Sequence, residues 1–318
     1  MTDTETGGRG DGGTGSAPHP GLITHDSSLM THHSSLITPR RSYLRRKATN
    51  WIMLGLALAG AVVSIAFLFS VLGYVLLHGG SALNLDFFTH LPKPVGEPGG
   101  GMANAIVGTL TLLAIASLLG IPIGVGAGIY LAEYGGGRLG TAVRFVTDVL
   151  TGIPSITIGI FAYTMVVLPM QRFSTLAGGV ALAIIMIPTV TRATEEMMKL
   201  VPGSLREASL ALGVPMWKTV LRVVVPTAMG GIVTGAMLAV ARAGGETAPL
   251  LFTSFGNRFW SLSLDRPIAA LPLQVYTYAI SPYDDWRAQA WAGSLVLVAM
   301  VLVISVIARF STRGNRMR

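Results

Sequence analysis

Long apolar runs without a charged residue alternate with short polar segments along most of the chain. The first run covers residues 51–77, and five more cover residues 103–132, 149–171, 173–191, 223–241 and 288–308. A helix needs about 20 apolar residues to cross the hydrocarbon core of a bilayer, and irregular backbone cannot face lipid. The pattern therefore predicts an all-α integral membrane protein with six transmembrane helices.

Polar residues set the limits of several predicted spans. A tight turn is predicted at residues 168–172 (Leu-Pro-Met-Gln-Arg), between the third and fourth runs, and the fifth run extends past Arg242 and Glu246 to about Phe252. The first run is long and lacks a small-residue cleavage site. It is therefore predicted to remain as a span and not to be removed as a signal peptide.

The two ends of the chain differ from the rest in composition. Residues 1–49 are rich in Gly, Ser, Thr, Pro and His and have no apolar period, which predicts a disordered N-terminal tail. Residues 50–310 are predicted to form the transmembrane domain, and residues 311–318 a short C-terminal tail. The tail histidines have no Cys or carboxylate partners in fixed geometry, so no metal site is expected.

The overall charge balance agrees with a membrane protein. Only 12% of the 318 residues are charged, against about 25% in a typical soluble domain. With the N-terminus inside, seventeen of the 23 Lys and Arg residues lie on the inner side, five lie outside, and Arg242 lies within the membrane. Positively charged short loops stay cytoplasmic, so both termini are predicted in the cytoplasm of a bacterial cell, in a multi-pass protein of the inner (plasma) membrane. The net charge of +8 then requires no nucleic-acid partner.

The inner segment between the fourth and fifth runs, residues 192–222, has a pattern of helix starts and stops. A Val-Pro-Gly sequence at residues 201–203 is predicted to end one helix. Ser204 stands three residues before Glu207, which is the spacing of a capping box. A short helix is therefore predicted from Leu205 to about Leu212.

The next residues predict a glycine turn and a second helix. Gly213 stands where a helix favours a left-handed terminator, and Pro215 is predicted at the first position of a new helix. That helix carries Trp217 and is predicted to end against Pro226. On the residues alone, an amphipathic helix pair resting on the membrane surface is an alternative.

This loop resembles the cytoplasmic loop motif of ABC importer permeases. In that family Glu-Ala-Ala is followed after three residues by Gly, and after nine more by Ile-x-Leu-Pro. The matching residues here are Glu207, Ala208, Ser209, Gly213 and the segment 223–226, which ends in Pro226. The resemblance implies a type I ABC importer permease fold, with the short helix as a coupling helix seated in a cleft of an ATPase subunit.

Two charged residues lie inside the fifth predicted span. A charge at the bilayer centre costs about 2.5–3.5 kcal/mol even on insertion scales, so such residues usually face a pathway or each other. Arg242 and Glu246 are four residues apart, which places them on one helix face. They are predicted to line a substrate pathway, although a structural pair that locks helices together is an alternative. Arg192, at the inner end of the fourth span, could by itself be an ordinary topology-setting charge.

The surroundings of this pair resemble the PstA permease family of the phosphate-specific ABC transporter. The matching stretches are residues 152–163, 241–253 and 271–276 (Leu-Pro-Leu-Gln-Val-Tyr), and the likeness covers about residues 50–310. It implies phosphate as the substrate and transport roles for Arg192, Arg242 and Glu246. The partners that it implies are a homologous permease subunit of the PstC type, two copies of a PstB-type ATPase, and a periplasmic or lipid-anchored phosphate-binding protein of the PstS type.

The chemistry of these residues is compatible with phosphate. A guanidinium group presents a fork of donors that matches phosphate oxygens. Glu246 could pair with Arg242 when phosphate is absent and compete for it afterwards. The two glycines at 244 and 245 could loosen the helix between them, and Pro249 would interrupt its hydrogen bonds just beyond.

Other functions remain open at this point. A permease for another oxyanion, of the sulfate or molybdate type, would have the same loop, and a phosphate-sensing membrane scaffold without transport is a different class. An enzyme is not expected, because the spans contain no Ser/His, Asp/Asp or metal-ligand set. The chain also lacks a G-x-x-x-x-G-K-[ST] phosphate-binding loop, so ATP is expected on a partner and no cofactor on this chain.

Overall fold

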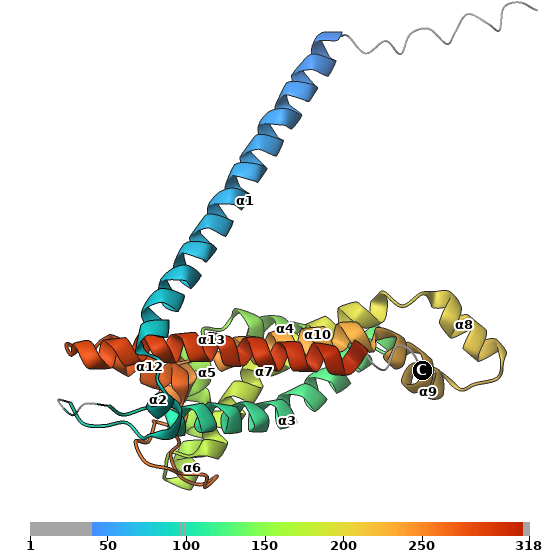
Figure 1. The fold of residues 1–318 in the computed structure, drawn as a ribbon. Coiled ribbons are helices and arrows are strands. Elements are labelled where there is room, and N and C mark those ends of the chain that lie inside the picture. The colour runs from blue at the N-terminus through green and yellow to red at the C-terminus, as the bar shows by residue number, and fades with distance from the viewer. Residues whose placement is uncertain (1–39, 96, 98, 314–318) are drawn as a thin grey trace, which may run out of the picture. The chain divides into compact units, whose positions relative to one another are not determined.

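The computed structural model describes residues 40–95, 97 and 99–313, and every named element in this part of the chain is a helix (Figure 1). The described residues divide into two units, one up to residue 66 and one from residue 67 onward. Helix α1 (Arg40–Ala82) starts ten residues before the predicted transmembrane domain, so residues 40–49 of the predicted tail are helical. The rest of that tail, with its histidines, lies outside the described residues.

Most predicted spans coincide with long helices. In the described part of the chain, five helical stretches are long and apolar enough to cross a membrane: Tyr43–Ala82, Ala103–Glu133, Thr175–Lys199, Met216–Gly244 and Asp284–Phe310. They correspond to α1, α3 (Ala103–Glu133), α7 (Thr175–Lys199), α9 to α10 (Val225–Gly244), and α13 (Asp284–Arg313). A sixth crossing requires the pair described next.

The third predicted span is broken, and its prediction as one continuous helix was wrong. Helix α4 (Arg138–Gly152) forms one part of the pair. The other part is a continuous stretch of α5 (Ser155–Ala162), the π-helical turn η2 (Tyr163–Val167) and α6 (Leu168–Met170). The chain bends by 108° between the two parts. The cause is Pro154, because the residue before a proline is driven out of the α region. Accordingly, Ile153 has the extended ψ of 133°.

The fifth predicted span differs from the prediction at both ends. Helix α9 (Met216–Thr219) runs through a π-helical turn, η3 (Val220–Val224), directly into α10, so Pro226 does not end the second helix. The widened turn lets Val225 donate to Val220, five residues back, and makes room for the proline that follows. At the other end α10 stops at Gly244, and α11 (Ala248–Thr253) is a separate helix.

Close helix contacts build the core. Helices α3 and α7 run parallel, and a Cβ on Gly124 or Gly128 of α3 would lie 2.7 or 2.5 Å from the Cβ of Val190 or Thr194 of α7. Helix α10 runs antiparallel to α7, since Gly231 packs on Met197 and Gly235 on Ala193. Small residues let these backbones approach closely, as is common between membrane helices.

Two short helices lie between the long ones, outside the predicted spans. They are α2 (Leu85–Thr89) and α12 (Leu271–Ala279). Both contribute to an apolar cluster in which Phe87, Leu271 and Tyr278 are buried against the beginnings of α3 and α13. These segments therefore add to the buried core of the protein.

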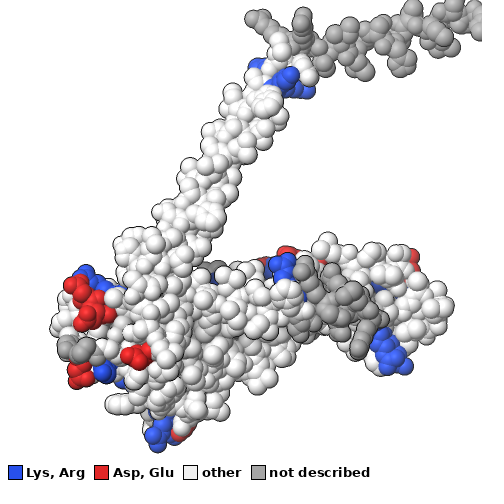
Figure 2. All heavy atoms as spheres, in the orientation of Figure 1, with Lys and Arg blue, Asp and Glu red and all other residues white. Residues whose placement is uncertain are grey.

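Charged side chains gather at the two ends of the unit that starts at residue 67. On the face shown in Figure 2, its middle stretch is almost free of charge. The ion pairs Arg144–Glu195 and Arg206–Glu133 lie at the end where α3 and α7 finish, and Arg172–Asp265 and Arg287–Asp284 lie at the other. An uncharged band between two charged ends is what a membrane-spanning body requires.

Candidate functional site

The predicted coupling helix is present as α8 (Gly203–Ala211), which Figure 1 shows near the ends of the long helices. It ends as predicted at Gly213, whose φ is +76°. Gly213 donates to the carbonyl of Leu210 at 2.9 Å, and Val214 donates to that of Ser209 at 3.3 Å. These two bonds are a Schellman motif, which satisfies the last carbonyls of the helix and needs a left-handed residue.

The start of α8 differs from the prediction, and the capping box is absent. Pro202, in extended backbone with ψ of 138°, is the cap residue and makes no side-chain cap bond. The helix therefore starts two residues earlier than expected, which moves Ser204 into its first turn, where its hydroxyl cannot cap. Pro215 likewise caps α9 from the position before the helix, with ψ of 149°, and does not occupy its first position.

The predicted coupling residues of α8 divide between two faces. Glu207 and Ala208 are exposed, whereas Ser209 is buried and shares a 2.8 Å hydrogen bond with the Thr219 hydroxyl. Pro226 lies elsewhere, at the base of α10 just after η3. The structure thus presents Glu207 and Ala208 outward and uses Ser209 to join α8 to the next helix.

Large apolar side chains are also exposed in the segment that carries Glu207 and Ala208. Leu212 is 84% exposed and Trp217 is 56% exposed. The loop that carries them lies outside the apolar band, because its flanking helices end in charged residues. Exposed apolar side chains grouped in this way mark an interaction surface. The sequence motif missed this feature, which only the folded loop reveals.

Arg242 and Glu246 form the predicted pair at the end of α10. The Arg242 Nε lies 3.7 Å from Glu246 Oε1, and the side chains are 49% and 17% exposed. The helix ends at Gly244, but the Glu246 N–H still donates to the Ala243 carbonyl at 3.2 Å, which keeps Glu246 on the face of Arg242. Pro249 lies in the first turn of α11, as its second residue, and interrupts no helix, contrary to the prediction.

Arg192 is surrounded by carboxylates that the sequence did not bring to notice. It donates to Asp148 of α4, and its Nη1 lies 3.6 Å from Oε2 of Glu195. Glu195 is 1% exposed and also accepts from Arg144 Nε at 2.9 Å and from Lys199 Nζ at 2.6 Å. These five charged residues tie α4 to α7 at the end of the bundle where α3 and α7 finish.

The structure does not bring Arg192 and Arg242 together. Within the described residues no hydrogen bond or ion pair joins Arg192 to Arg242 or Glu246. Gly235 of α10 packs on Ala193, so Arg242 lies seven residues farther along α10, about 10 Å at the rise of an α-helix. The three predicted pathway residues thus form two separate charged groups at different depths.

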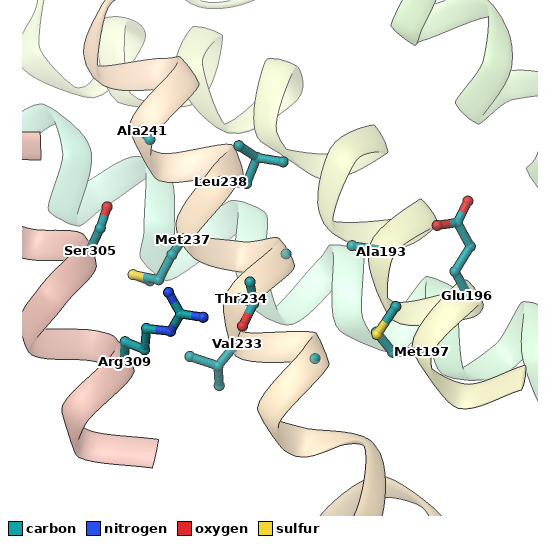
Figure 3. A pocket seen from close by; sticks show the side chains of 12 residues that line it. Ala193, Glu196, Met197, Val233, Thr234, Met237, Leu238, Ala241, Ser305 and Arg309 are labelled. Atoms are coloured by element: carbon teal, nitrogen blue, oxygen red, sulfur yellow. The ribbon is translucent and has the colours of Figure 1, made fainter. Parts of the chain in front are cut away.

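A cavity of about 500 Å³ lies between α7, α10 and α13 (Figure 3), and along α10 its lining runs from Gly231, which packs on Met197, to Ala241. Its lining includes Ala193, which follows Arg192, and Ala241, which precedes Arg242. Arg309 of α13 and Glu196 of α7 also line it, but most of the wall is apolar, with Met197, Met237 and Leu238.

Glu195 and Asp148 are the site residues that sequence reasoning missed. Glu195 stands three residues after Arg192 and four before Lys199, a helical spacing for ion pairs that could have indicated it. The pairing of Asp148 with Arg192 could not be predicted from the sequence, because Asp148 lies 44 residues before Arg192 and the helix that carries it was not predicted.

Comparison with solved structures defines the fold. The chain is similar to a chain of a bacterial alginate ABC transporter, with a TM-score of 0.61 over 85% of this chain and 97% of that one, at 13% identity. It is also similar to a chain of the MetNI methionine ABC transporter, with a TM-score of 0.56 over 67% of this chain and 95% of that one, at 20% identity. The fold is therefore the type I ABC importer permease fold.

Sequence comparison narrows the class to a family. Residues 124–316 match the family described as binding-protein-dependent transport system inner membrane component. The chain is 44% identical to the phosphate transport system permease protein PstA of Yersinia pestis, over 85% of this chain and 92% of that protein. It is 38% identical to PstA 1 of Mycobacterium tuberculosis strain H37Rv, over 86% and 92%.

The chain belongs to this family of inner-membrane components, and within it to the PstA permeases. It is thus a multi-pass membrane protein, and it works as part of an ABC system with an ATPase and a substrate-binding protein.

Proposed function

We propose that this chain is the permease subunit of an ATP-driven importer of inorganic phosphate. The observation that carries the proposal is its 44% identity, over 85% of its length, to a phosphate transport system permease protein. The Arg242–Glu246 pair supports the substrate class, because a guanidinium group can offer two parallel donors to a phosphate group.

Arg242 binds phosphate by exchanging one anionic partner for another. Without phosphate, Glu246 neutralises its guanidinium at 3.7 Å. Phosphate then replaces the carboxylate, and the return of Glu246 favours release, so that the anion is not trapped. The break at residues 245–247, between α10 and α11, gives Glu246 room to move away without disturbing either helix.

Arg192 acts deeper in the pathway by the same exchange. Asp148 and Glu195 hold its guanidinium, and Asp148, whose side chain is 57% exposed, is the partner that can be displaced. Glu195 is fixed by two further cations, so it keeps Arg192 in place while Asp148 exchanges with phosphate.

The individual partner subunits are assigned from the PstA family. The pathway is completed by a homologous permease subunit of the PstC type, two PstB-type ATPase copies bind at the α8 surfaces, and a PstS-type protein delivers phosphate on the outer side. Glu207, Ala208, Gly213 and the exposed Leu212 and Trp217 are the contact residues toward the ATPase. The exposure of these side chains supports this role.

Both termini lie in the cytoplasm. The bent α4 to α6 pair counts as one crossing, which gives six and returns the chain to its starting side. The parallel course of α3 and α7 and the antiparallel course of α10 are consistent with this order. The excess of Lys and Arg in the inner segments sets the direction.

Oxyanion competition in a purified system tests the substrate. The complete importer in proteoliposomes, with ATP inside and the binding protein outside, is expected to take up radiolabelled phosphate, and excess unlabelled sulfate or molybdate should not reduce uptake. Competition by sulfate or molybdate as strong as by phosphate would instead assign another oxyanion. ATP hydrolysis without uptake of any of the three would favour a sensing role.

A further inference from the structure

Helix α8 has no fully buried apolar side chain among its described residues. Ser209 is the one buried residue among those that the structure describes in this helix. Its leucines are only partly covered, with Leu205 40% and Leu210 45% exposed. The hydrophobic effect therefore supplies only part of what holds α8 in place, and polar contacts supply the rest.

One of these contacts is a fork made by Arg206. Its Nη2 donates to Glu133 Oε1 at 2.6 Å, and its Nε lies 3.2 and 3.3 Å from the two Glu133 oxygens. The same guanidinium donates to the backbone carbonyls of Val201, at 2.8 Å, and of Met198, at 3.0 Å. Arg206 thus connects α8 to the last residue of α3 and to the end of α7.

The burial and placement of these groups set the contact apart from a surface ion pair. The Glu133 side chain is 3% exposed and that of Arg206 is 19% exposed. A carboxylate at a helix C-terminus is disfavoured by the helix dipole, so Glu133 does not serve α3 by itself. A guanidinium beside the last carbonyls of α7 is, in contrast, favourable.

We propose that Arg206 and Glu133 are positioning residues that transmit movement of the ATPase from α8 to α3 and α7 as one body. The proposal rests on the proposed function, in which the outer face of α8 binds the ATPase. Arg206 and Ser209, three residues apart, share the inner face, while Glu207 and Ala208 are exposed. Since α3 and α7 are closely packed at Gly124 and Gly128, a displacement of α8 moves both helices together.

The contact depends on the shape of arginine. Lysine carries all its donors on one atom, which cannot serve Glu133 and two carbonyls that approach from different sides. Arg206→Lys therefore keeps the charge but loosens the link, and Glu133→Gln weakens it from the other side. Arg138→Lys is a matched control, because Arg138 is exposed at the same end and has no part in the contact.

A distance measurement tests the link without depending on the substrate. The chain has no cysteine, so spin labels at Ala211→Cys and Tyr134→Cys report the separation of α8 and α3 in the complete complex, with cysteine-free partners. One narrow distance distribution, unchanged by ATP, is expected for the parent chain and for Arg138→Lys. Arg206→Lys and Glu133→Gln should broaden it. A distribution that stays narrow in both variants overturns the proposal.

Transport tests the consequence of the link. In proteoliposomes Arg206→Lys and Glu133→Gln are expected to hydrolyse ATP while moving roughly two- to thirtyfold less phosphate per ATP, the range that mutations between coupled sites produce. The double variant should be no worse than the worse single one, because both act through one contact. A merely structural role would lower hydrolysis and uptake together and leave the ratio unchanged, which would overturn the proposal. A parent complex that moves no phosphate would refute the proposed function alone, and the distance measurement would still decide on the link.

Discussion

The Arg242 guanidinium lies 3.7 Å from the Glu246 carboxylate across the point where α10 ends. Arg242 lies on the regular helix α10 and is therefore fixed, whereas Glu246 lies on the three-residue break between α10 and α11. Two charges that both belonged to a rigid helix could not easily part, whereas Glu246 can turn away when its segment shifts. This geometry supports an exchange of partners over a permanent lock between helices.

Replacing Arg242 by lysine tests whether bidentate binding matters. Arg242→Lys keeps the positive charge but loses the second parallel donor, and a hydrogen bond to a charged group contributes about 1.5–3 kcal/mol. Phosphate uptake by cells that express this variant should therefore fall roughly ten- to hundredfold. Uptake equal to that of the parent chain, at equal membrane levels of the two proteins, would count against the bidentate contact.

Gly213 offers a test of the α8 surface. A Cβ there would meet no atom within 4 Å, but the φ of +76° is strained for most residues. Asn and Asp both tolerate this conformation, so Gly213→Asp and Gly213→Asn differ mainly in charge. We expect the Asp variant to assemble and to hydrolyse ATP with little phosphate uptake, and the Asn variant to retain more. Full transport by Gly213→Asp would contradict a coupling role for this turn.

Glu195 should be important for stability. Glu195→Gln removes the buried negative charge that holds Arg144 and Lys199. Breaking a buried pair costs 3–5 kcal/mol, but these cations are 32% and 55% exposed, so about 1–2 kcal/mol is expected here. The thermal unfolding midpoint of the purified complex in detergent should drop by a few degrees. Glu196→Gln provides the control, because Glu196 is the exposed neighbour of Glu195. A drop of the same size in the unfolding midpoint of Glu196→Gln would show that Glu195 has no special role in stability.

The contact between α3 and α7 predicts a size limit at Gly124. A Cβ at this position would lie 2.7 Å from the Cβ of Val190, whereas one at Gly126 would meet nothing within 4 Å. Gly124→Val should therefore cost more than the usual 1–3 kcal/mol of overpacking and reduce the amount of folded protein in the membrane. Gly126→Ala should leave that amount unchanged. Equal amounts of both variants would show that α3 and α7 pack differently.

Features that depend on neighbours in sequence could be predicted. The length of the apolar runs predicted five of the six crossings as continuous helices. The turn at Gly213 was predicted from the presence of a glycine at that position. Pro154 and Pro226 show the limit of such reasoning. Both prolines interrupt apolar runs, yet one bends the chain by 108° and the other lies in a continuous helix whose preceding turn widens to accept it. Which outcome occurs depends on the packing around each proline.

The charged contacts could be predicted only where both partners lie on one helix. Arg242 and Glu246 are four residues apart, so their pairing followed from helical spacing. Asp148 with Arg192, and Glu133 with Arg206, join residues 44 and 73 positions apart. These pairs depend on the course of α4 and on the position of α8 against α3, which the sequence pattern did not predict.

Radiolabelled phosphate uptake in cells that lack this subunit, complemented with the parent chain or with Arg242→Ala, tests the central claim most directly. The account predicts that the parent chain restores high-affinity uptake and that Arg242→Ala does not, at equal levels of both proteins in the membrane. Uptake that changes with neither the deletion nor the variant would contradict phosphate as the substrate and Arg242 as part of its pathway.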